Sequence, residues 1–239
     1  MTKAIITWGG WEGHEPDKVA NLFQAMLTDA GIEVEVTDSL ACFDDPEHLQ
    51  GLDLIVPVWT MSTLSREAAM NVSSAVGAGT GLAGCHGGMC DAFRDNVLWQ
   101  FMTGGNWVAH PGGDGVDYRV RITAPDHELV SGLQDFDVRS EQYYLHVDPA
   151  VQVLAETTFP SVNWYHAANG PVAMPVVWTK HWGLGRVYYN ALGHKANVIA
   201  QGPAHEMLRR GLIWAAGGKA RAQAQGDDPA RFHSEGNHF

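Results

Sequence analysis

Basic residues are scarce in this sequence. Lysine and arginine together number 15 against 27 aspartate and glutamate residues, which gives a formal net charge of −12 at pH 7. Binding to nucleic acid depends on clustered Lys and Arg, and so does attraction to an anionic membrane surface. We therefore expect neither nucleic acid nor a membrane among the partners of this protein.

Long apolar runs and paired cysteines are also missing. The sequence has no run of about 18 apolar residues, the minimum for a membrane-spanning helix. Its first residues, MTKAIITWGG, enter a predicted strand at once and lack the apolar region of a signal peptide. The three cysteines, Cys42, Cys85 and Cys90, show neither zinc-type nor C-x-x-C spacing, which indicates reduced thiols. Together these absences predict a cytoplasmic protein.

Apolar residues, histidine and tryptophan are abundant. Hydrophobic residues make up 45% of the 239 positions and charged residues 18%, which is typical of a well-packed globular protein. This length suits one large α/β domain. The 12 histidines and 9 tryptophans could together line a polar pocket with aromatic walls.

The first part of the chain alternates predicted strands with predicted helices. Helices are expected from Pro16 to the stop at Gly31, and from Ser65 as N-cap to Val76. The expected strands are 3–7, 33–37, 52–58 and 81–84. This order predicts a mostly parallel central sheet with helices on both faces.

The second part begins with a glycine-rich stretch, residues 98–117, which we expect to be irregular and to form a pocket wall through its aromatic residues. Strands are expected at 118–122, 151–156, 172–179 and 186–191. The last two are joined by a short turn, which predicts an antiparallel extension of the sheet. A helix over 204–216 would end the domain, residues 1–216, and residues 217–239 are expected to be a flexible or partner-docked tail.

A sharp turn is predicted where the strand at 81–84 meets the next helix. Gly84, Gly87 and Gly88 would supply the positive φ that a strained strand-to-helix turn needs. In the register of a G-x-nucleophile-x-G turn, the residue presented at its tip is His86 and not Cys85. His86 would then face ligands at the carboxyl edge of the sheet, or would merely bind nearby backbone.

The loop after the first strand, Trp8 to Pro16, occupies the place of a phosphate-binding loop. It is not G-x-G-x-x-G, and Glu12, His14 and Glu15 would repel phosphate, so no nucleotide cofactor is expected. His14 beside these two acids suits metal binding or acid–base catalysis. The alternative is a solvated helix N-terminus.

Seven short motifs follow one another along the chain. They are Gly13-His14-Glu15, GTGLAGCHGG, Gly104-Gly105, Glu141-Gln142-Tyr143, Pro175-Val176-Val177-Trp178, Gly185-Arg186-Val187-Tyr188-Tyr189 and Gly193-His194. In these motifs the chain resembles the trehalose-utilisation family, the ThuA-like proteins, over residues 4–216. One departure is Ser140, where the family often has an acidic residue before the glutamate.

The resemblance implies a flavodoxin-like α/β fold similar to that of class I glutamine amidotransferases, without their cysteine nucleophile. It also implies bacterial sugar catabolism, with keto-sugars or keto-disaccharides of the trehalose type as substrates. A divalent metal and a partner sugar dehydrogenase are further implications. We also expect a homo-oligomer.

One hypothesis is a metal-assisted enzyme that cleaves or isomerises a keto-glycoside. His86, Glu141 and His194 would bind the metal, with zinc as the first expectation, and would leave one position open. His14 and His205 are reserve ligands or the general base, and Tyr143 would donate to the developing enolate. The residues expected to contact the sugar are Trp11, Trp59, Trp107 and His110.

Two alternatives stay open at this stage. The chain could be a non-catalytic sugar-binding subunit of a sugar dehydrogenase system, because an aromatic pocket suits binding as well as catalysis. Metal-free acid–base catalysis by His86 and Glu141 is the other. Thiol chemistry at Cys85 or Cys90 is disfavoured by the register of the turn.

Overall fold

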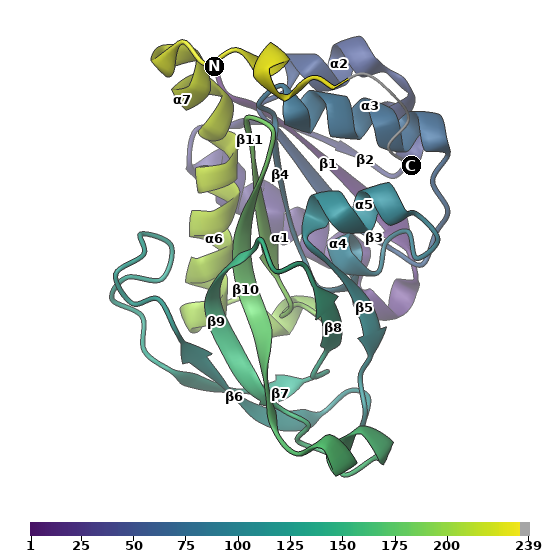
Figure 1. Ribbon diagram of the computed structural model, residues 1–239, viewed down its shortest axis with the longest axis vertical. Helices are drawn as coiled ribbons and strands as arrows, with labels where there is room; N and C mark the ends of the chain where they lie inside the picture. Colours follow the sequence, from purple (N-terminus) through teal and green to yellow (C-terminus); the bar gives the residue numbers. More distant parts are fainter. Residues whose placement is uncertain (235–239) are drawn as a thin grey trace.

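A parallel sheet forms the centre of the computed structural model, which describes residues 1–234 (Figure 1). Five neighbouring strands run parallel in the order β2-β1-β3-β4-β11. Their bounds are Glu33–Thr37 (β2), Lys3–Gly10 (β1), Leu54–Thr60 (β3), Gly81–Cys85 (β4) and Gly185–Asn190 (β11). β3 and β4 are almost continuously apolar and buried, as expected of strands covered on both faces.

An antiparallel extension continues the same sheet beyond β11. Its strands are β10 (Val172–Trp182), β9 (Gln152–Phe159), β6 (Val116–Ile122) and β7 (Phe136–Ser140), in that spatial order. The predicted hairpin is confirmed, because β10 and β11 pair from Val177 opposite Asn190 to Trp182 opposite Gly185. The predicted α/β fold with an antiparallel extension is therefore correct.

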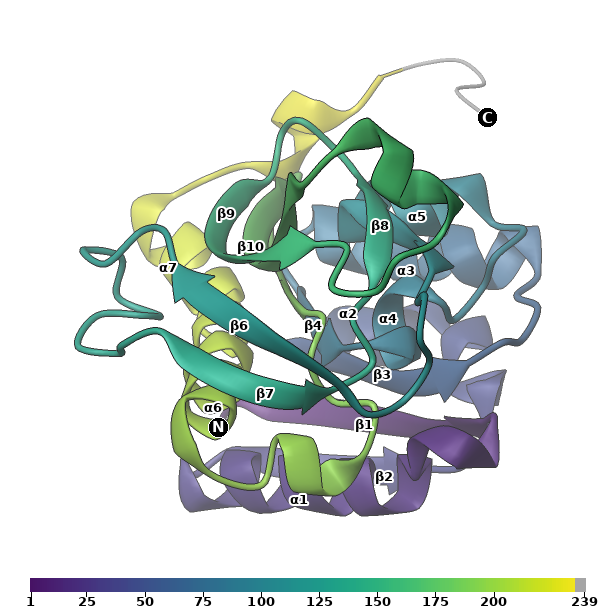
Figure 2. The same ribbon diagram turned by 90° about the horizontal axis from the view of Figure 1, so that it is seen from below.

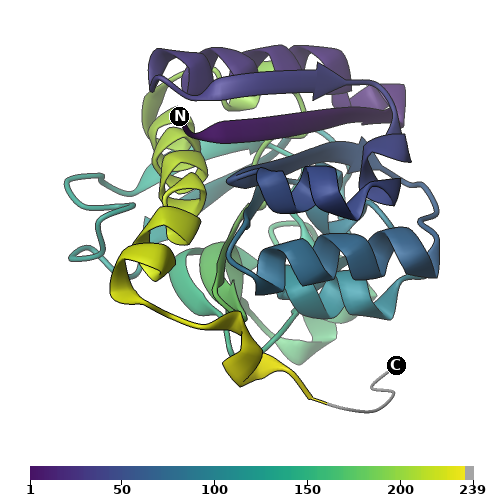
Figure 3. The same cartoon turned by 90° about the horizontal axis from the view of Figure 1, so that it is seen from above.

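Helices cover both faces of the parallel strands (Figure 3). On one face, α1 (Pro16–Asp29) packs on β1 and β2, and α6 (Gly202–Ala216) packs on β4 and β11. On the other face lie α3 (Arg66–Gly77), its neighbour α2 (Pro46–Gly51) and α5 (Val97–Thr103). The predicted N-cap is present, since the Ser65 hydroxyl accepts from the amide of Ala68.

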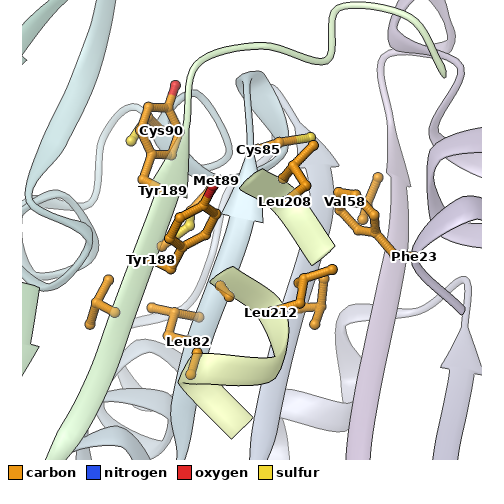
Figure 4. Packing of buried hydrophobic residues seen from close by; sticks show 14 of the residues in the cluster. Phe23, Val58, Leu82, Cys85, Met89, Cys90, Tyr188, Tyr189, Leu208 and Leu212 are labelled. Carbon is orange, nitrogen blue, oxygen red and sulfur yellow. The ribbon is translucent and has the colours of Figure 1, made fainter. Parts of the chain in front are cut away.

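The core between α6 and the sheet is closely packed (Figure 4). Leu208 and Leu212 of α6 lie over the buried Tyr188 of β11, whose hydroxyl donates to the carbonyl of Met207 at 2.9 Å. Satisfying this hydroxyl inside the core avoids the cost of an unpaired buried polar group. The contact fixes where α6 lies over the parallel strands.

Residues 98–117 are more regular than the sequence analysis expected. They include most of α5 and a strand, β5 (Gly105–Ala109), which pairs with β8 (Tyr144–Val147) in a separate two-stranded sheet. The expectation of an irregular segment was wrong because Asn96 caps α5 through the amide of Trp99 and Gly104, at φ 88°, ends it. Gly104 therefore marks the end of a helix, while residues 110–115 form the loop after β5.

The chain continues past α6 into another helix, α7 (Gly218–Gln225), which packs on α6 and β11. This helix lies at the start of the expected tail, 217–239. Residues 235–239 of that tail lie outside the described residues, and the division into a domain and a tail stays a prediction.

The remaining short elements are α4 (Gly87–Cys90) and 3-10 turns at Glu12–His14, Leu40–Asp44, Tyr165–Asn169, Ala196–Val198 and Pro229–Phe232. In the part of the chain that the structure describes, no helix is both long and apolar enough to cross a membrane.

Candidate metal centre

Four side chains from distant parts of the chain meet at the carboxyl edge of the parallel sheet. His14 follows β1, His86 follows β4 and His194 follows β11, while Glu141 follows β7 of the extension. The four potential ligand atoms all lie within 4.8 Å of one another, and all four residues are buried. This edge is where ligands bind in open α/β sheets.

One oxygen of Glu141 is the centre of the group. Oε2 lies 3.1 Å from His86 Nε2, 3.3 Å from His194 Nδ1 and 3.9 Å from His14 Nε2. An ion bonded at about 2.1 Å to nitrogen and oxygen donors holds neighbouring donors roughly 3.0–3.5 Å apart. The observed separations are therefore close to those of a metal-ligand set.

The hydrogen bonds of His86 also favour a cation here. Its Nδ1 lies 2.8 Å from the carbonyl oxygen of Ala191, which can only accept. A neutral imidazole has one proton, so donation to Ala191 leaves a lone pair on Nε2 facing the carboxylate of Glu141. Two acceptors at 3.1 Å repel each other unless a cation lies between them, either a proton that makes His86 an imidazolium or a metal ion.

The other two histidines are oriented in the same way. His14 Nδ1 lies 2.9 Å from the Thr60 hydroxyl, which leaves Nε2 for the cluster. His194 Nε2 faces Asp114 at 3.6 Å, and its Nδ1 is buried with no hydrogen-bond partner among the described residues. Metal-binding histidines characteristically use their second nitrogen in this manner. The residues present fit a divalent metal ion.

The protonation of the cluster suits a cation. Burial alone would raise the pKa of Glu141, but its contacts with His194 and His86 hold that pKa well below the ordinary range. Burial, together with the neighbouring histidines, lowers the pKa of His14 from 6.5 to about 2, and burial also lowers the pKa of His86. Neutral imidazoles and an ionised carboxylate are the states that bind metals.

The turn after β4 presents His86 as predicted, but its strain lies elsewhere. The positive φ belongs to His86 itself (φ 50°, ψ −138°), whereas Gly84, Gly87 and Gly88 have no positive φ. The glycines are needed for close approach: a Cβ on Gly87 would lie 2.6 Å from Cε1 of His14. Because a non-glycine residue rarely adopts such a conformation, the surrounding structure must hold His86 there.

The cysteine beside His86 is not displayed at the site. Cys85 is buried among core residues such as Leu208, and burial raises the pKa of its thiol to about 12 (Figure 4). A buried thiol in apolar surroundings is inert as a nucleophile. The burial of Cys85 therefore agrees with the prediction that thiol chemistry is disfavoured here.

Two residues to which the sequence analysis gave no role hold the Glu141 segment. The hydroxyl of Tyr118 on β6 donates to the main-chain oxygen of Glu141 at 2.9 Å. The side chain of Gln142 donates to the Thr157 hydroxyl at 3.1 Å and to the carbonyl of Thr158 at 2.9 Å. The antiparallel extension thus carries the carboxylate to the edge of the parallel sheet.

Two predicted residues lie against the cluster. Tyr143 stacks on His86, with ring centroids 3.8 Å apart, and its role as a donor stays a prediction. Trp11 contacts His14 edge to face at 4.7 Å and is 45% exposed, so it borders the cluster on the solvent side.

Two more predicted residues lie on the far side of Tyr143. The ring centroid of Trp107 is 6.3 Å from that of Tyr143 and 5.5 Å from that of His110. His110 Nδ1 lies 3.7 Å from Oε1 of Glu141, the oxygen that does not face the other three histidines. Trp107 and His110 are therefore placed together, next to the carboxylate.

Two predicted residues are not part of this group. Trp59 lies against Gly9, its partner on β1, where a Cβ would be 2.8 Å from the indole ring. His205 is outside the four-residue cluster. It lies in the first turn of α6, and its side chain is half-buried there. His14 is the fourth member of the group instead.

Replacing Thr60 by Val is expected to weaken zinc binding by about 10- to 100-fold, the usual cost of losing an outer partner of a ligand. The change removes the group that orients His14 while keeping the side-chain shape. Competition with a chromophoric chelator measures the affinity. Thr80→Val is the matched control, since Thr80 is also buried and donates to the carbonyl of Leu52. Equal affinities for both variants would refute an orienting role for Thr60.

Metal-free protein is expected to lose stability on acidification below pH 6.5. The unfolded chain binds protons on His14 and His86 where the folded chain resists them, because burial lowers their folded pKa values from 6.5. The loss is at most about 1.4 kcal/mol per pH unit for each histidine. Glu141 adds to it only below its unfolded pKa of 4.5.

Urea denaturation of chelator-treated protein at pH 7.0 and 5.5 measures this loss. We expect the free energy of unfolding to fall by about 1–3 kcal/mol, and by less in His14→Gln. A free energy that stays constant or rises on acidification would contradict the assigned protonation states.

Comparison with known proteins supports the fold. A model of the family described as trehalose utilisation (ThuA) matches residues 3–215. A ThuA-like protein from Bacteroides uniformis superposes with a TM-score of 0.72 and 16% identity, covering 95% of this chain and 94% of the other. One from Parabacteroides merdae gives 0.68 and 17%, covering 92% and 91%.

A cytoplasmic protein from Salmonella typhimurium superposes with a TM-score of 0.64 and 13% identity, covering 90% of this chain and 99% of the other. No curated protein sequence matches the chain. At these identities, the structural neighbours share the fold alone.

Proposed function

Since the chain belongs to the trehalose-utilisation (ThuA) family, we propose that its histidine–glutamate cluster is the active site of a sugar-metabolising enzyme. The observation that carries the proposal is the arrangement around Glu141, with three buried imidazoles on Oε2 and His110 beside Oε1. Burial of a carboxylate among several titratable groups costs desolvation free energy. Clusters of this kind occur mainly at functional sites, where their chemistry is used.

The substrate we propose is a keto-glycoside of the 3-keto-glucoside or trehalose type. Its 3-keto group acidifies the hydrogen on C2, so a base can remove that proton. The electron pair left on C2 then forms the C1–C2 double bond as the C1–O bond breaks, and the departing oxygen takes up a proton. Addition of water across the double bond would complete a net hydrolysis. Returning the proton to a different carbon would give isomerisation instead.

His110 is the residue that we assign as general base. Its Nδ1 faces Oε1 of Glu141 at 3.7 Å, a contact that tightens to a hydrogen bond with a small movement. With the Nδ1 proton held by the carboxylate, Nε2 carries the lone pair. The side chain is 37% exposed, so its outer part is open to a substrate.

The metal that these residues fit would be held by His14, His86, His194 and Glu141. When bound, it would supply a positive charge that polarises the keto group and stabilises the enolate formed by deprotonation. Three imidazoles with one carboxylate suit zinc and also other divalent transition metals. Tyr143, stacked on His86, keeps that ring in place and excludes water from it.

A non-catalytic sugar-binding role is less well supported. An accessory subunit needs an aromatic pocket, but it has no use for a buried carboxylate ringed by histidines. A sugar dehydrogenase remains the partner that we propose, because the keto group must come from the oxidation of a sugar hydroxyl. We also propose a cytoplasmic location.

Metal content and turnover together test this function. Purified protein is analysed for metals, reloaded with zinc, manganese or cobalt, and assayed on 3-keto-glucosides beside the parent glucosides. We expect bound metal and turnover of the keto compounds only. Binding of sugar without product, together with co-purification of an oxidoreductase, would favour the accessory role. Full turnover by chelator-treated protein would exclude the metal from the mechanism.

A further inference from the structure

A hollow of about 380 Å³ opens beside the candidate active site. One wall comprises residues 107–112, from β5 and the loop after it, and the other comprises residues 162–164. The second wall leads into the 3-10 turn Tyr165–Asn169, which lies beside β8 in Figure 2, where His166 packs on Tyr144 at 4.6 Å. The volume is within the range of small-molecule pockets, about 300–1,000 Å³.

His110 connects this hollow to the cluster. It lines the hollow and also lies 3.7 Å from Oε1 of Glu141. A molecule in the hollow therefore reaches the general base directly. Nothing in the reaction proposed above uses the opposite wall, residues 162–164.

The two walls are tied to the frame that holds Glu141. Gln142, the next residue, accepts a hydrogen bond from the amide of Ser161 at 2.9 Å through its side-chain oxygen. Gly112 and Val162 are in close contact, since a Cβ on Gly112 would lie 2.7 Å from the Val162 side chain. Such a pre-formed pocket binds a ligand at a lower entropic cost than a mobile one.

Two tryptophan rings line the hollow, one on each wall. The guanidinium of Arg94 lies 4.3 Å from the Trp107 ring centroid and is paired with Asp91, so this indole is held in place. Trp164, on the opposite wall, is 52% exposed. Exposure of a large aromatic side chain to water is unfavourable, and a ligand that covers the ring removes this cost. Such rings offer flat apolar faces to ring-shaped molecules.

The lining also restricts the charge of the ligand. Apart from His110, the lining residues have no titratable side chain, and Asn163 is the other polar one. No lysine or arginine among them could pair with a phosphate. A neutral ring with apolar faces and polar edges matches this surface, and a pyranose has that form.

We propose that this hollow is a subsite for the second ring of a neutral disaccharide, with Trp164 as the stacking surface. The inference rests on the proposed function, which places the oxidised ring at the metal centre and the bond to be broken near His110. It names the substrate class as an unphosphorylated disaccharide glycoside. A phosphorylated disaccharide would lose its phosphate hydration without gaining a cationic partner.

The test compares Trp164→Ala with wild type on 3-keto-trehalose and on methyl 3-keto-glucoside. We expect the ratio of kcat/KM for the disaccharide to kcat/KM for the methyl glycoside to fall about tenfold, mainly through KM. Phe232→Ala is the matched control, because Phe232 is an aromatic residue of similar exposure, 49% against 52% for Trp164, and does not line the hollow. An unchanged ratio in Trp164→Ala would overturn the subsite and leave the proposed function intact.

Binding of unoxidised sugars tests the subsite without turnover. Saturation-transfer NMR on the zinc-loaded protein is expected to give a stronger signal with trehalose than with trehalose 6-phosphate, and the trehalose signal is expected to drop in Trp164→Ala. If no keto-sugar is turned over, the proposed function fails and this measurement alone decides the subsite. Equal trehalose signals in the wild type and Trp164→Ala, or none in the wild type, would refute it.

Discussion

Glu141→Gln abolishes metal binding in our account, and turnover falls with it. The carboxylate oxygen Oε2 lies within 3.9 Å of nitrogen atoms of three histidines, so the amide removes the only negative charge in the cluster. Orienting partners of ligands contribute about 10- to 100-fold to affinity, and a ligand at the centre of the set should contribute more than 100-fold. Metal analysis after dialysis measures the loss.

The fold is expected to survive this change. Glutamine keeps the volume of Glu141, and the main-chain oxygen still accepts from Tyr118. Glu156→Gln is the control, because it makes the same substitution on β9, where Glu156 pairs with Arg121 at 2.6 Å. A Glu141→Gln protein that kept one equivalent of metal would contradict the assigned ligand set.

His110→Asn is expected to lower kcat by about 10²- to 10⁴-fold while metal content stays unchanged. His110 faces Oε1 of Glu141 and not the oxygen that the other histidines share, so its loss removes a base but no ligand. Steady-state assays and metal analysis measure these two quantities.

His146→Asn provides the matched control for this variant. His146 lies on β8 in the same small sheet, is exposed and does not belong to the cluster. Its substitution should leave kcat as in wild type. If His110→Asn lost metal, or kept the kcat of the wild type, His110 would not be the base.

Much of the fold could be predicted because local signals and topology agree. Pro16 and Ser65 begin helices where the sequence places them, and the buried apolar runs of β3 and β4 identify parallel strands. The prediction for the stretch around α5 was wrong, because a glycine such as Gly104 interrupts the apolar periodicity both where a helix ends and where a loop begins. Composition alone does not separate those cases.

The candidate site was predicted only in part. The spacing of the glycines in the turn after β4 predicted that His86 lies at its tip, and the family motifs indicated Glu141 and His194. The sequence did not separate His14 from His205 as the fourth member of the group. The structure places His14 in the group and leaves out His205, which lies in the first turn of α6, because the meeting of side chains from distant loops depends on how the helices pack on the sheet.

The roles of the supporting residues do not follow from the sequence, although Gln142 belongs to the motif Glu141-Gln142-Tyr143. Tyr118 and Gln142 act through one hydrogen bond to a main-chain oxygen and a set of bonds to β9 and Ser161. These contacts join segments 15 to 23 residues apart, and their partners follow only from strand pairing. Trp164 likewise becomes a wall only because its loop packs beside Gly112.

An anomalous-scattering crystal structure of the zinc-loaded protein tests the metal centre most directly. We predict one peak per chain, about 2.0–2.2 Å from His14 Nε2, His86 Nε2, His194 Nδ1 and Glu141 Oε2. An absent peak in protein shown to be loaded, or a peak bound by other residues, would contradict the account.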